Sequence, residues 1–546
     1  MLPARGTIAA LAVAVRNENV RRVELAWGAA IAAEWAHLVA LSVFAYHGGG
    51  ASAVGVAGLV RLLPAATIAP VAASLADRFP RDRFLLAVTL LGAVALAASA
   101  AAAFAGQRFL VYAFAAVVGL SSTLLRPTLQ ALLPSLARTP EELIASNGAT
   151  STIESIGTLA GPLLAGVLVS VSSAGVVFAG GAGAVLAGVA LLARVRVEGR
   201  APRPARAGQT RVFRVFAEGF AAVAQVPGAR LVGALMVAQA FVRGCLNVLI
   251  VVAAFRVLHA GAGAVGYLTA AIGVGGLLGA VAAMTLGGQR LAITFGVSLV
   301  FWGAPIALLA PGRYLVVALV LLAVVGAANS VEDVAGFTLL QRTIPDEALA
   351  RVLGLVWGTA MGALALGSFA APALVRASGP RPAFLVVGAI LPLLTLATYG
   401  RLRRIDRKTV PLLELALIER VPMFAPLSIA AKEGIARRLI PVTVAAGESV
   451  IRTGEVGDRF YIVGGGELDV DAAGRRTSLR ESDSFGEIAL LRDVPRTATV
   501  TAVVESHLYA LQREDFLAAV TGHSGARAAG DAVVGAHLGE LPGTSP

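Results

Sequence analysis

SFGEIALLRDVPRTATV, residues 484–500, follows a series of short apolar runs separated by Gly and Asp, a pattern that indicates β-strands and turns. Gly486 allows close approach of the backbone, and residues 487–491 are predicted to form a short helix whose first amides face an anion. Arg496, expected on the next strand, offers a forked cation, and Glu487 offers hydrogen-bond acceptors. An acid and an Arg serving one ligand predict a site for a molecule with a phosphate and free hydroxyls.

The region around this stretch is predicted to be a separate soluble domain, because charged residues become frequent after Lys408 and no further spanning run occurs. Residues 411–428 suggest a short helix, a Pro-bounded turn and the start of another helix that ends near 440. From Val442 the pattern changes to short strands. We expect an antiparallel β-roll flanked by helices.

Residues 411–525 resemble the cyclic nucleotide-binding domain. Besides FGEIALL and PRTATV, the residues that carry the resemblance are Ala446, Gly447, Glu448, Gly454, Gly457, Asp458 and Tyr461. The resemblance implies that Arg496 binds the cyclic phosphate and that Glu487 binds the ribose 2′-hydroxyl. The ligand-binding residues it implies are Phe485, Gly486, Glu487, Ile488, Ala489, Arg496, Thr497 and Ala498.

The identity of the nucleotide rests on weaker evidence. Family frequency favours cAMP over cGMP, although the Thr497 hydroxyl is of a kind that the family also associates with guanine. The structural alternative for the motif is that Glu487 and Arg496 only pair with each other across a turn. No metal is expected, since the sequence has a single Cys and no His-rich spacing, and no enzymatic motif with its framework is present.

The first 400 residues have the composition of a membrane protein. The whole chain is 57% hydrophobic and 14% charged, with a mean hydropathy of +0.79. Residues 411–546 hold 13 Lys and Arg against 18 Asp and Glu, so the formal net charge of +12 comes from residues 1–410, with 32 against 15. Basic loops of a membrane protein explain this excess, and nucleic-acid binding is excluded as its cause.

The apolar runs predict twelve transmembrane helices in two groups of six, each run being long enough to cross a hydrocarbon core about 30 Å thick. The spans are 23–46, 53–76, 84–105, 109–133, 149–172, 174–194, 230–255, 262–286, 291–310, 314–340, 352–376 and 381–400. Loops rich in Arg alternate with loops poor in basic residues, so both termini and the C-terminal domain are expected in the cytoplasm of a multi-pass cell-membrane protein. The arginines at 5, 16, 21 and 22 precede the first span without a convincing cleavage site, so the N-terminus is expected to be retained.

The two helical halves echo each other, because TLQALLP at 128–134 recurs as TLLQRTIP at 338–345. At this point the first 405 residues resemble the major facilitator superfamily. The loop SLADRFPRDR at 74–83 is similar to the family's gating loop and implies gating roles for Asp77, Arg78 and Arg81, although Ala73 and Pro80 replace the family's glycines.

A second similarity to this family lies in GTLAGPLLAG at 157–166, which resembles the motif of proton-exchanging exporters. Packing through small residues is its alternative explanation.

Ionisable residues inside the spans are candidates for transport chemistry, because an isolated charge near the bilayer centre is costly. They are Glu34, His37, Arg126, Glu154, Arg243, Glu332 and Asp333. Glu34 and His37 are close to one turn apart, which puts them on one helical face, and we expect proton coupling through Glu34 and Asp333. Structural ion pairs with Arg126 or Arg243 are the alternative for the acids.

The sequence therefore predicts a secondary active transporter, a proton-coupled exporter of a small amphipathic molecule, regulated by a cyclic nucleotide. The alternatives are a membrane-anchored nucleotide receptor without transport and a lipid or lysolipid transporter. The lipid bilayer, a small-molecule substrate and protons are the expected partners, and a homodimer is left open. The expected domains are a helical half at 1–200, a connector at 201–228, a second half at 229–405, a linker helix at 406–420 and the nucleotide domain at 421–546.

Overall fold

The structure is a computed structural model, in which the chain forms two compact units. The first comprises Met1–Phe337 and Arg351–Arg403, and the second comprises Thr338–Ala350 and Arg404–Pro546. The residues that the structure describes are 17–76, 79–136, 140–195, 226–283, 290–344, 346–407, 412–427, 429–472, 474–521 and 524–539.

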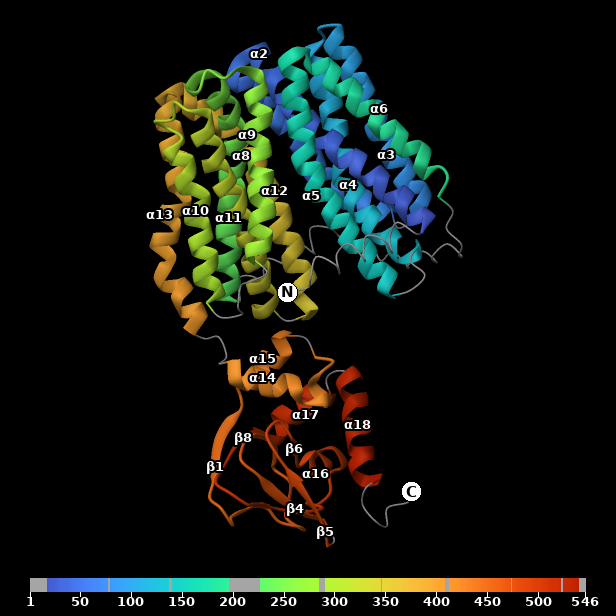
Figure 1. Cartoon of the computed structure of the whole chain (residues 1–546), viewed down its shortest axis with the longest axis vertical. Helices are drawn as coiled ribbons and strands as arrows, with labels where there is room; N and C mark the ends of the chain where they lie inside the picture. Colours follow the sequence, from blue (N-terminus) through green and yellow to red (C-terminus); the bar gives the residue numbers. More distant parts are fainter. Residues whose placement is uncertain are drawn as a thin grey trace. The chain divides into compact units, whose positions relative to one another are not determined.

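Long helices build the first unit, and the chain passes through them in two successive groups (Figure 1). The first group is α2 (Glu18–Ala76), α3 (Arg81–Phe104), α4 (Arg108–Leu136), α5 (Pro140–Val171) and α6 (Ala174–Leu192). The second group is α8 (Pro227–Val252), which continues into the π-helical turn η1 (Ala253–Val257), then α9 (Gly261–Ala283), α10 (Leu291–Leu308), α11 (Leu315–Thr343), α12 (Asp346–Ser378) and α13 (Pro380–Arg407).

Helix α2 contains both of the first two predicted spans. Its 59 residues are interrupted at Gly49 and Gly50, where the backbone leaves helical φ and ψ, and Gly50 has φ +63°. A straight helix of this length would measure close to 90 Å, far more than a bilayer core, so two crossings by α2 would require this kink. Among the described residues, eleven helices are long and apolar enough to span a membrane, and α2 counts once among them. The count of twelve stays a prediction.

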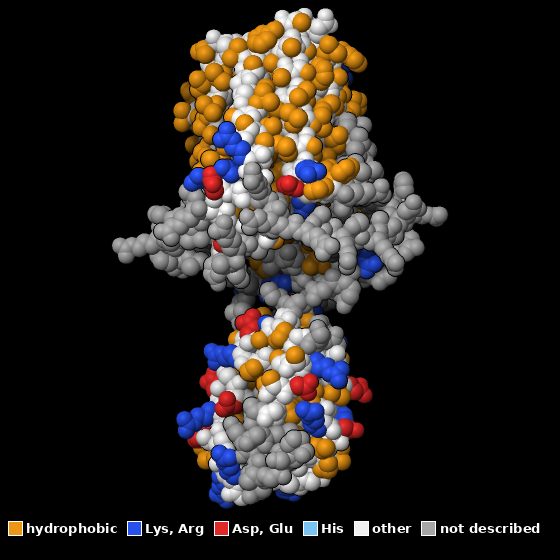
Figure 2. Space-filling model, turned by 90° about the vertical axis from the view of Figure 1, so that its right-hand side faces the viewer, with side chains coloured by type: hydrophobic (Ala, Val, Ile, Leu, Met, Phe, Trp, Pro, Cys, Tyr) orange, Lys and Arg blue, Asp and Glu red, His pale blue; other side chains and the backbone are white. Residues whose placement is uncertain are grey.

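The surface of the helical unit is suited to lipid. On the face seen in Figure 2, hydrophobic side chains cover most of its described surface. Phe109, Val171 and Leu396 are among the large apolar side chains exposed on it. Exposed apolar area of this extent is typical of a surface that faces hydrocarbon rather than water, so this part of the chain belongs in a membrane.

Glycines bring α5 into close contact with two other helices. A Cβ at Gly157 would lie 2.6 Å from Ile31 Cγ2 on α2, and a Cβ at Gly161 would overlap the Ala32 carbonyl oxygen on the same helix. Gly166 packs against the backbone of Gly263 and Gly266 on α9. The motif at 157–166 therefore serves small-residue helix packing, the alternative named above.

In its described residues, the second unit contains eight strands in two four-stranded antiparallel sheets, as the β-roll prediction requires. One sheet has the order β1-β8-β3-β6 and the other the order β2-β7-β4-β5. The strands are β1 (Ile440–Val444), β2 (Ser449–Ile451), β3 (Arg459–Gly465), β4 (Leu468–Ala472), β5 (Arg475–Leu479), β6 (Ser484–Phe485), β7 (Thr499–Ala502) and β8 (Ser506–Gln512).

Helices flank this β-roll and close its core. They are α14 (Leu412–Arg420), the 3₁₀ turn η2 (Pro422–Phe424), α15 (Ile429–Ala436), α16 (Glu487–Arg492), α17 (Arg513–Thr521) and α18 (Ser524–Gly539). The rings of Phe424, Phe460 and Phe516 pack together in the core, and the Phe460 and Phe516 centroids are 4.7 Å apart. Aromatic packing of this kind adds to the burial energy of the rings, and it joins the helices to β3.

A segment from the end of α11 to the start of α12, residues 338–350, belongs to the second unit. Inside this unit, Arg342 Nε lies 2.6 Å from Glu433 Oε1 on α15, and Arg437 Nη2 lies 3.4 Å from the other Glu433 oxygen. The Glu433 side chain is 3% exposed. A buried carboxylate needs such partners, and the Arg342–Glu433 pair holds residues 338–350 to α15.

Candidate functional site

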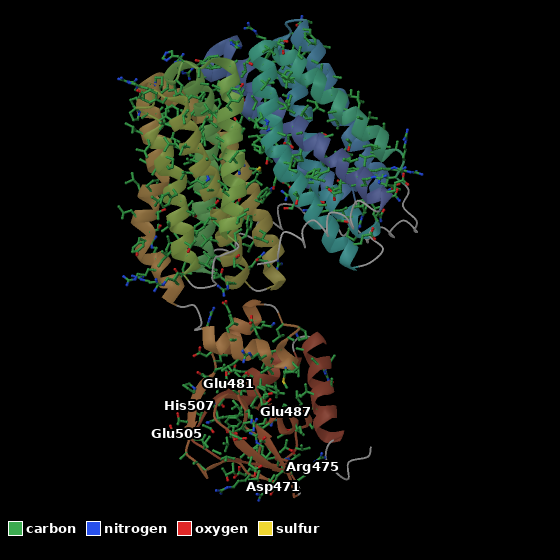
Figure 3. The ribbon with its side chains drawn as sticks, viewed as in Figure 1. Asp471, Arg475, Glu481, Glu487, Glu505 and His507 are labelled. Atoms are coloured by element: carbon green, nitrogen blue, oxygen red, sulfur yellow. The ribbon has the colours of Figure 1, made fainter. Side chains whose placement is uncertain are left out.

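The second unit contains a cavity of about 170 Å³ between β4 and β5 on one side and the segment from β6 to β7 on the other. Its lining residues are Ile451, Val470, Ala472, Arg475, Thr477, Leu479, Ser484, Phe485, Gly486, Glu487, Ile488, Ala489, Arg496, Thr497, Ala498 and Val500. All eight residues predicted to bind the nucleotide are among them. Figure 3 labels Glu487 at the start of α16, and Asp471 and Arg475 on the β4–β5 hairpin.

Gly486 links β6 to α16 in a conformation that only glycine adopts easily. Its φ is +93°, in the left-handed region. A Cβ at this position would lie 2.6 Å from Arg496 Nη1 and 3.1 Å from the Arg459 carbonyl oxygen. The missing side chain therefore provides the space in which the Arg496 guanidinium lies.

Arg496 is fixed before any ligand arrives. The residue is 3% exposed, and its Nη1 and Nη2 donate hydrogen bonds to the carbonyl oxygens of Gly486 (3.1 Å) and Arg459 (2.7 Å). Asp458 Oδ1 lies 3.5 Å from Nη2. Burial lowers the pKa of the Arg496 guanidinium from its usual value, while Tyr461 and Asp458 oppose this shift. A guanidinium has five N–H donors, so Arg496 retains donors for an anion in the cavity.

The described residues do not support the alternative that Glu487 and Arg496 only pair with each other. The acidic partner of Arg496 is Asp458, and Glu487 is not among its ion-pair partners. Glu487 is 2% exposed and lines the same cavity. A buried carboxylate and a buried guanidinium thus line the same cavity.

One detail of the prediction is wrong and one was missed. Arg496 does not lie on a strand, because β7 begins only at Thr499, and the turn before it is set by hydrogen bonds between the backbones of Arg496 and both Gly454 and Glu455. Arg475 and Thr477 on β5 also line the cavity. The motif at residues 484–500 does not indicate these two residues, because they reach the cavity through the pairing of β4 with β5.

The first unit contains a larger cavity, of about 610 Å³, enclosed by helices from both groups. The helices that line it are α2, α4, α5, α8, α9, α10 and α11. Four of the seven predicted intramembrane candidates lie on its wall: Arg126, Glu154, Arg243 and Asp333. Arg126 Nη1 lies 3.0 Å from Glu154 Oε1, which is the structural ion pair considered as an alternative.

The other three candidates do not line this cavity. Glu332 is 1% exposed, directly beside Asp333 in sequence. His37 is 1% exposed, and its ring centroid is 5.0 Å from that of Phe178. Glu34 Oε1 accepts a hydrogen bond from Arg61 Nη2 at 2.7 Å. The charge on Glu34 is thus balanced inside the first group of helices rather than in the cavity.

Arg61 was not recognised as a candidate from the sequence. It lies in the second predicted span, is 8% exposed and pairs with Glu34. A charged residue in a span is costly without a partner. The position of Arg61 in an apolar run was therefore the same signal that identified the other candidates.

An amide-centred network on the cavity wall was also missed. Asn329 Oδ1 accepts hydrogen bonds from Gln239 Nε2 and Trp302 Nε1, both at 3.1 Å, and Asn329 Nδ2 donates to Asp333 Oδ2 at 2.9 Å. These residues come from α8, α10 and α11. The network fixes the orientation of the Asp333 carboxylate, and uncharged polar residues far apart in sequence gave no sign of it.

The predicted gating loop is covered only in part. Asp77 and Arg78 lie outside the described residues, whereas Arg81 is exposed at the first position of α3. The gating role assigned to these three residues stays a prediction.

Comparisons with known proteins agree with both halves of this description. Residues 25–291 match the family model of the Major Facilitator Superfamily, and residues 441–523 match that of the cyclic nucleotide-binding domain. A cAMP-dependent protein kinase regulatory subunit from Yarrowia lipolytica is 37% identical over 102 residues, which are 18% of this chain. The chain covers 27% of the length of that relative.

Two solved structures are similar to the C-terminal part. One is named "cAMP bound PfPKA-R (141-441)", with 31% identity, coverage of 19% of this chain and 39% of the other, and a TM-score of 0.19. The other is named "Sp-2Cl-cAMPS bound to PKAR CBD2", with 25% identity, coverage of 23% and 90%, and a TM-score of 0.21. The family matches and the two units together lead to one conclusion: this chain has a major facilitator superfamily region at residues 25–291 and a cyclic nucleotide-binding domain at residues 441–523.

Proposed function

We propose that this protein is a proton-coupled secondary transporter that exports a small amphipathic molecule and is regulated by cAMP. The observation that carries the proposal is the presence of two distinct cavities. One lies among membrane helices of both groups and has charged and apolar walls, and the other surrounds a buried Arg and Glu in the nucleotide domain. A membrane anchor without transport would not need the first cavity, so transport is preferred over a simple receptor.

The cAMP assignment rests on the residues that face the small cavity. Arg496 and Glu487 offer a forked cation for the cyclic phosphate and an acceptor for the ribose 2′-hydroxyl. The relatives whose names mention a nucleotide mention cAMP or its analogue, which supports cAMP rather than cGMP for this chain. Calorimetric titration of the full-length protein with both nucleotides tests this, and tighter binding of cGMP would reverse the assignment.

Transport is proposed to use the large cavity, with proton coupling through Glu34 and Asp333. Asp333 lies on the cavity wall, whereas Glu34 forms its ion pair with Arg61 inside the first group of helices. Carboxylates in partly dry surroundings are suited to carry protons. Uptake into proteoliposomes under an imposed pH gradient is the measurement. Glu34→Gln and Asp333→Asn are expected to abolish the response to the gradient, and a response retained in both would refute the coupling.

Regulation is proposed to act through a difference in cAMP affinity between two conformations of the transporter. A preference of about 1.4 kcal/mol would change their ratio about tenfold. The ion pair of Arg342 with Glu433 supports a route for this coupling, because it joins residues 338–350 to the nucleotide domain within one unit. Transport measured in vesicles loaded with and without cAMP tests the regulation, and equal rates would contradict it.

A further inference from the structure

The large cavity has four charged side chains on its wall, and three of them have partners. Arg126 and Glu154 form an ion pair at 3.0 Å. Asp333 accepts the hydrogen bond from Asn329 at 2.9 Å. These groups are held in place by the protein itself, so they are partly compensated before any substrate enters.

Arg243 is the exception. It is exposed on the cavity wall, and it makes no hydrogen bond or ion pair with any residue in the described part of the chain. Glu332 and Asp333 interact with it electrostatically. A guanidinium without a hydrogen-bond partner in a membrane cavity is costly unless a ligand or water serves it, so its N–H donors are available to an anion.

The helix packing directs Arg243 into the cavity. Its neighbours on the chain, Gly244 and Cys245, face α12, where Ser368 Oγ donates to the Gly244 carbonyl at 3.1 Å and Cys245 Sγ donates to the Gly367 carbonyl at 3.4 Å. A Cβ at Gly244 would overlap the backbone of α12. The packing of α8 against α12 therefore fixes the rotation of α8 that places Arg243 on the cavity wall.

Apolar side chains follow Arg243 along the same helix, with the polar Asn247 between them. Leu246 and Ile250 are three and seven residues further on and line the cavity, as expected for one helical face. Val265 and Ile272, seven residues apart on α9, line it as well. A cation followed by apolar side chains is complementary to an anionic head with an apolar tail. The cavity volume of about 610 Å³ is within the range of pockets for drug-sized ligands.

We propose that the substrate is an anionic amphiphile, whose negatively charged head binds Arg243 and whose apolar part lies along Leu246 and Ile250. This inference rests on the proposed transport function and names the class of its substrate. Arg243 is then the residue that selects the charge of the substrate, because a cationic amphiphile of equal length would be repelled by it.

The test uses three probes with the same octyl chain: octyl sulfate, octanol and octyltrimethylammonium. Each is titrated calorimetrically into the full-length protein in lipid nanodiscs, with empty nanodiscs to subtract partitioning into lipid. Octyl sulfate is expected to bind at least about tenfold more tightly than octyltrimethylammonium, because charge-assisted hydrogen bonds favour the anion.

Variants locate the effect. Arg243→Gln is expected to weaken octyl sulfate binding about tenfold or more and to leave octanol binding within about twofold. Arg243→Lys keeps the charge and is expected to retain most of the preference. Arg230→Gln removes an exposed charge from the start of the same helix and is the matched control.

Equal binding of octyl sulfate by the wild type and Arg243→Gln would overturn the proposal, and so would tighter binding of the cationic probe. Either one would leave transport of a different substrate class intact. Binding of octyl sulfate as expected, without its transport in proteoliposomes, would count against the transport function and not against the role of Arg243. Absence of binding by all three probes would also reject the amphiphile assignment.

Discussion

The arginines of the two cavities are held in opposite ways. Arg496 is 3% exposed and donates to two backbone carbonyls, so its guanidinium is placed before the ligand arrives. Arg243 is exposed on the wall of its cavity and has no hydrogen-bond partner among the described residues. A fixed group loses little freedom on binding and favours one ligand shape, whereas a free side chain must be ordered by each ligand. We therefore expect a selective nucleotide site and a more permissive substrate site.

The largest expected effect comes from removing the fixed cation. Arg496→Gln should weaken cAMP binding about 100-fold, because the phosphate loses charge-assisted hydrogen bonds that contribute close to 3 kcal/mol. Calorimetry on the full-length protein measures the loss. Arg476→Gln, which removes an exposed Arg from β5, should bind like the wild type. A decrease in cAMP affinity of less than about threefold in Arg496→Gln would contradict the difference described above between the arginines of the two cavities.

The second prediction tests whether the space at Gly486 holds Arg496 in place. Gly486→Ala should weaken cAMP binding about tenfold, because the added Cβ would lie 2.6 Å from Arg496 Nη1. Gly474→Ala is the matched control, since Gly474 also has a positive φ, +86°, but has no atom within 4 Å of an added Cβ. Similar loss in both variants would mean that backbone strain alone, rather than displacement of Arg496, causes the effect.

The third prediction concerns the carboxylate that is held in the membrane cavity. Asn329→Ala should lower the stability of the protein by about 1 kcal/mol, because Gln239 and Trp302 lose their shared acceptor and water in the cavity replaces it only in part. Thermal unfolding in detergent measures this. Ser330→Ala, which removes one hydrogen bond to the Gly276 carbonyl, is the neighbouring control. An unchanged melting temperature in Asn329→Ala would show that Asp333 is as free as Arg243.

The smallest effect is expected for the ion pair inside the second unit. Arg342→Gln should reduce the effect of cAMP on transport a few-fold and leave cAMP affinity nearly unchanged, because Arg342 is not among the residues that line the nucleotide cavity. Glu433→Gln should act similarly, and the double variant should add little to either single change. Strictly additive effects would argue against the pair as a coupling element.

How much the sequence could predict depends on how far apart the participating residues lie. The nucleotide-site residues fall within one short segment, so their turn, helix and cation could be recognised together. Arg475 reaches the same cavity only through the pairing of β4 with β5, which no local pattern encodes.

In the membrane unit, charge inside an apolar run identified Glu154, Arg243 and Asp333, because the cost of burial makes such residues conspicuous. The same rule did not reveal which side chains contact each other. The hydrogen bond between Arg61 and Glu34 joins residues 27 positions apart, and the one between Gln239 and Asn329 joins residues 90 apart. Those contacts are set by helix packing rather than by periodicity.

Helix packing between the two groups of helices has a consequence for the speed of transport. Where α5 meets α9, Gly166 lies against Gly263 and Gly266, so backbone touches backbone. Interlocked side chains would have to change rotamers whenever the two groups tilted against each other, and each change would add to the barrier. A contact without side chains can pivot while remaining dry and closely packed. We therefore expect that side-chain rotamer changes at this contact add little to the barrier for tilting of the two groups.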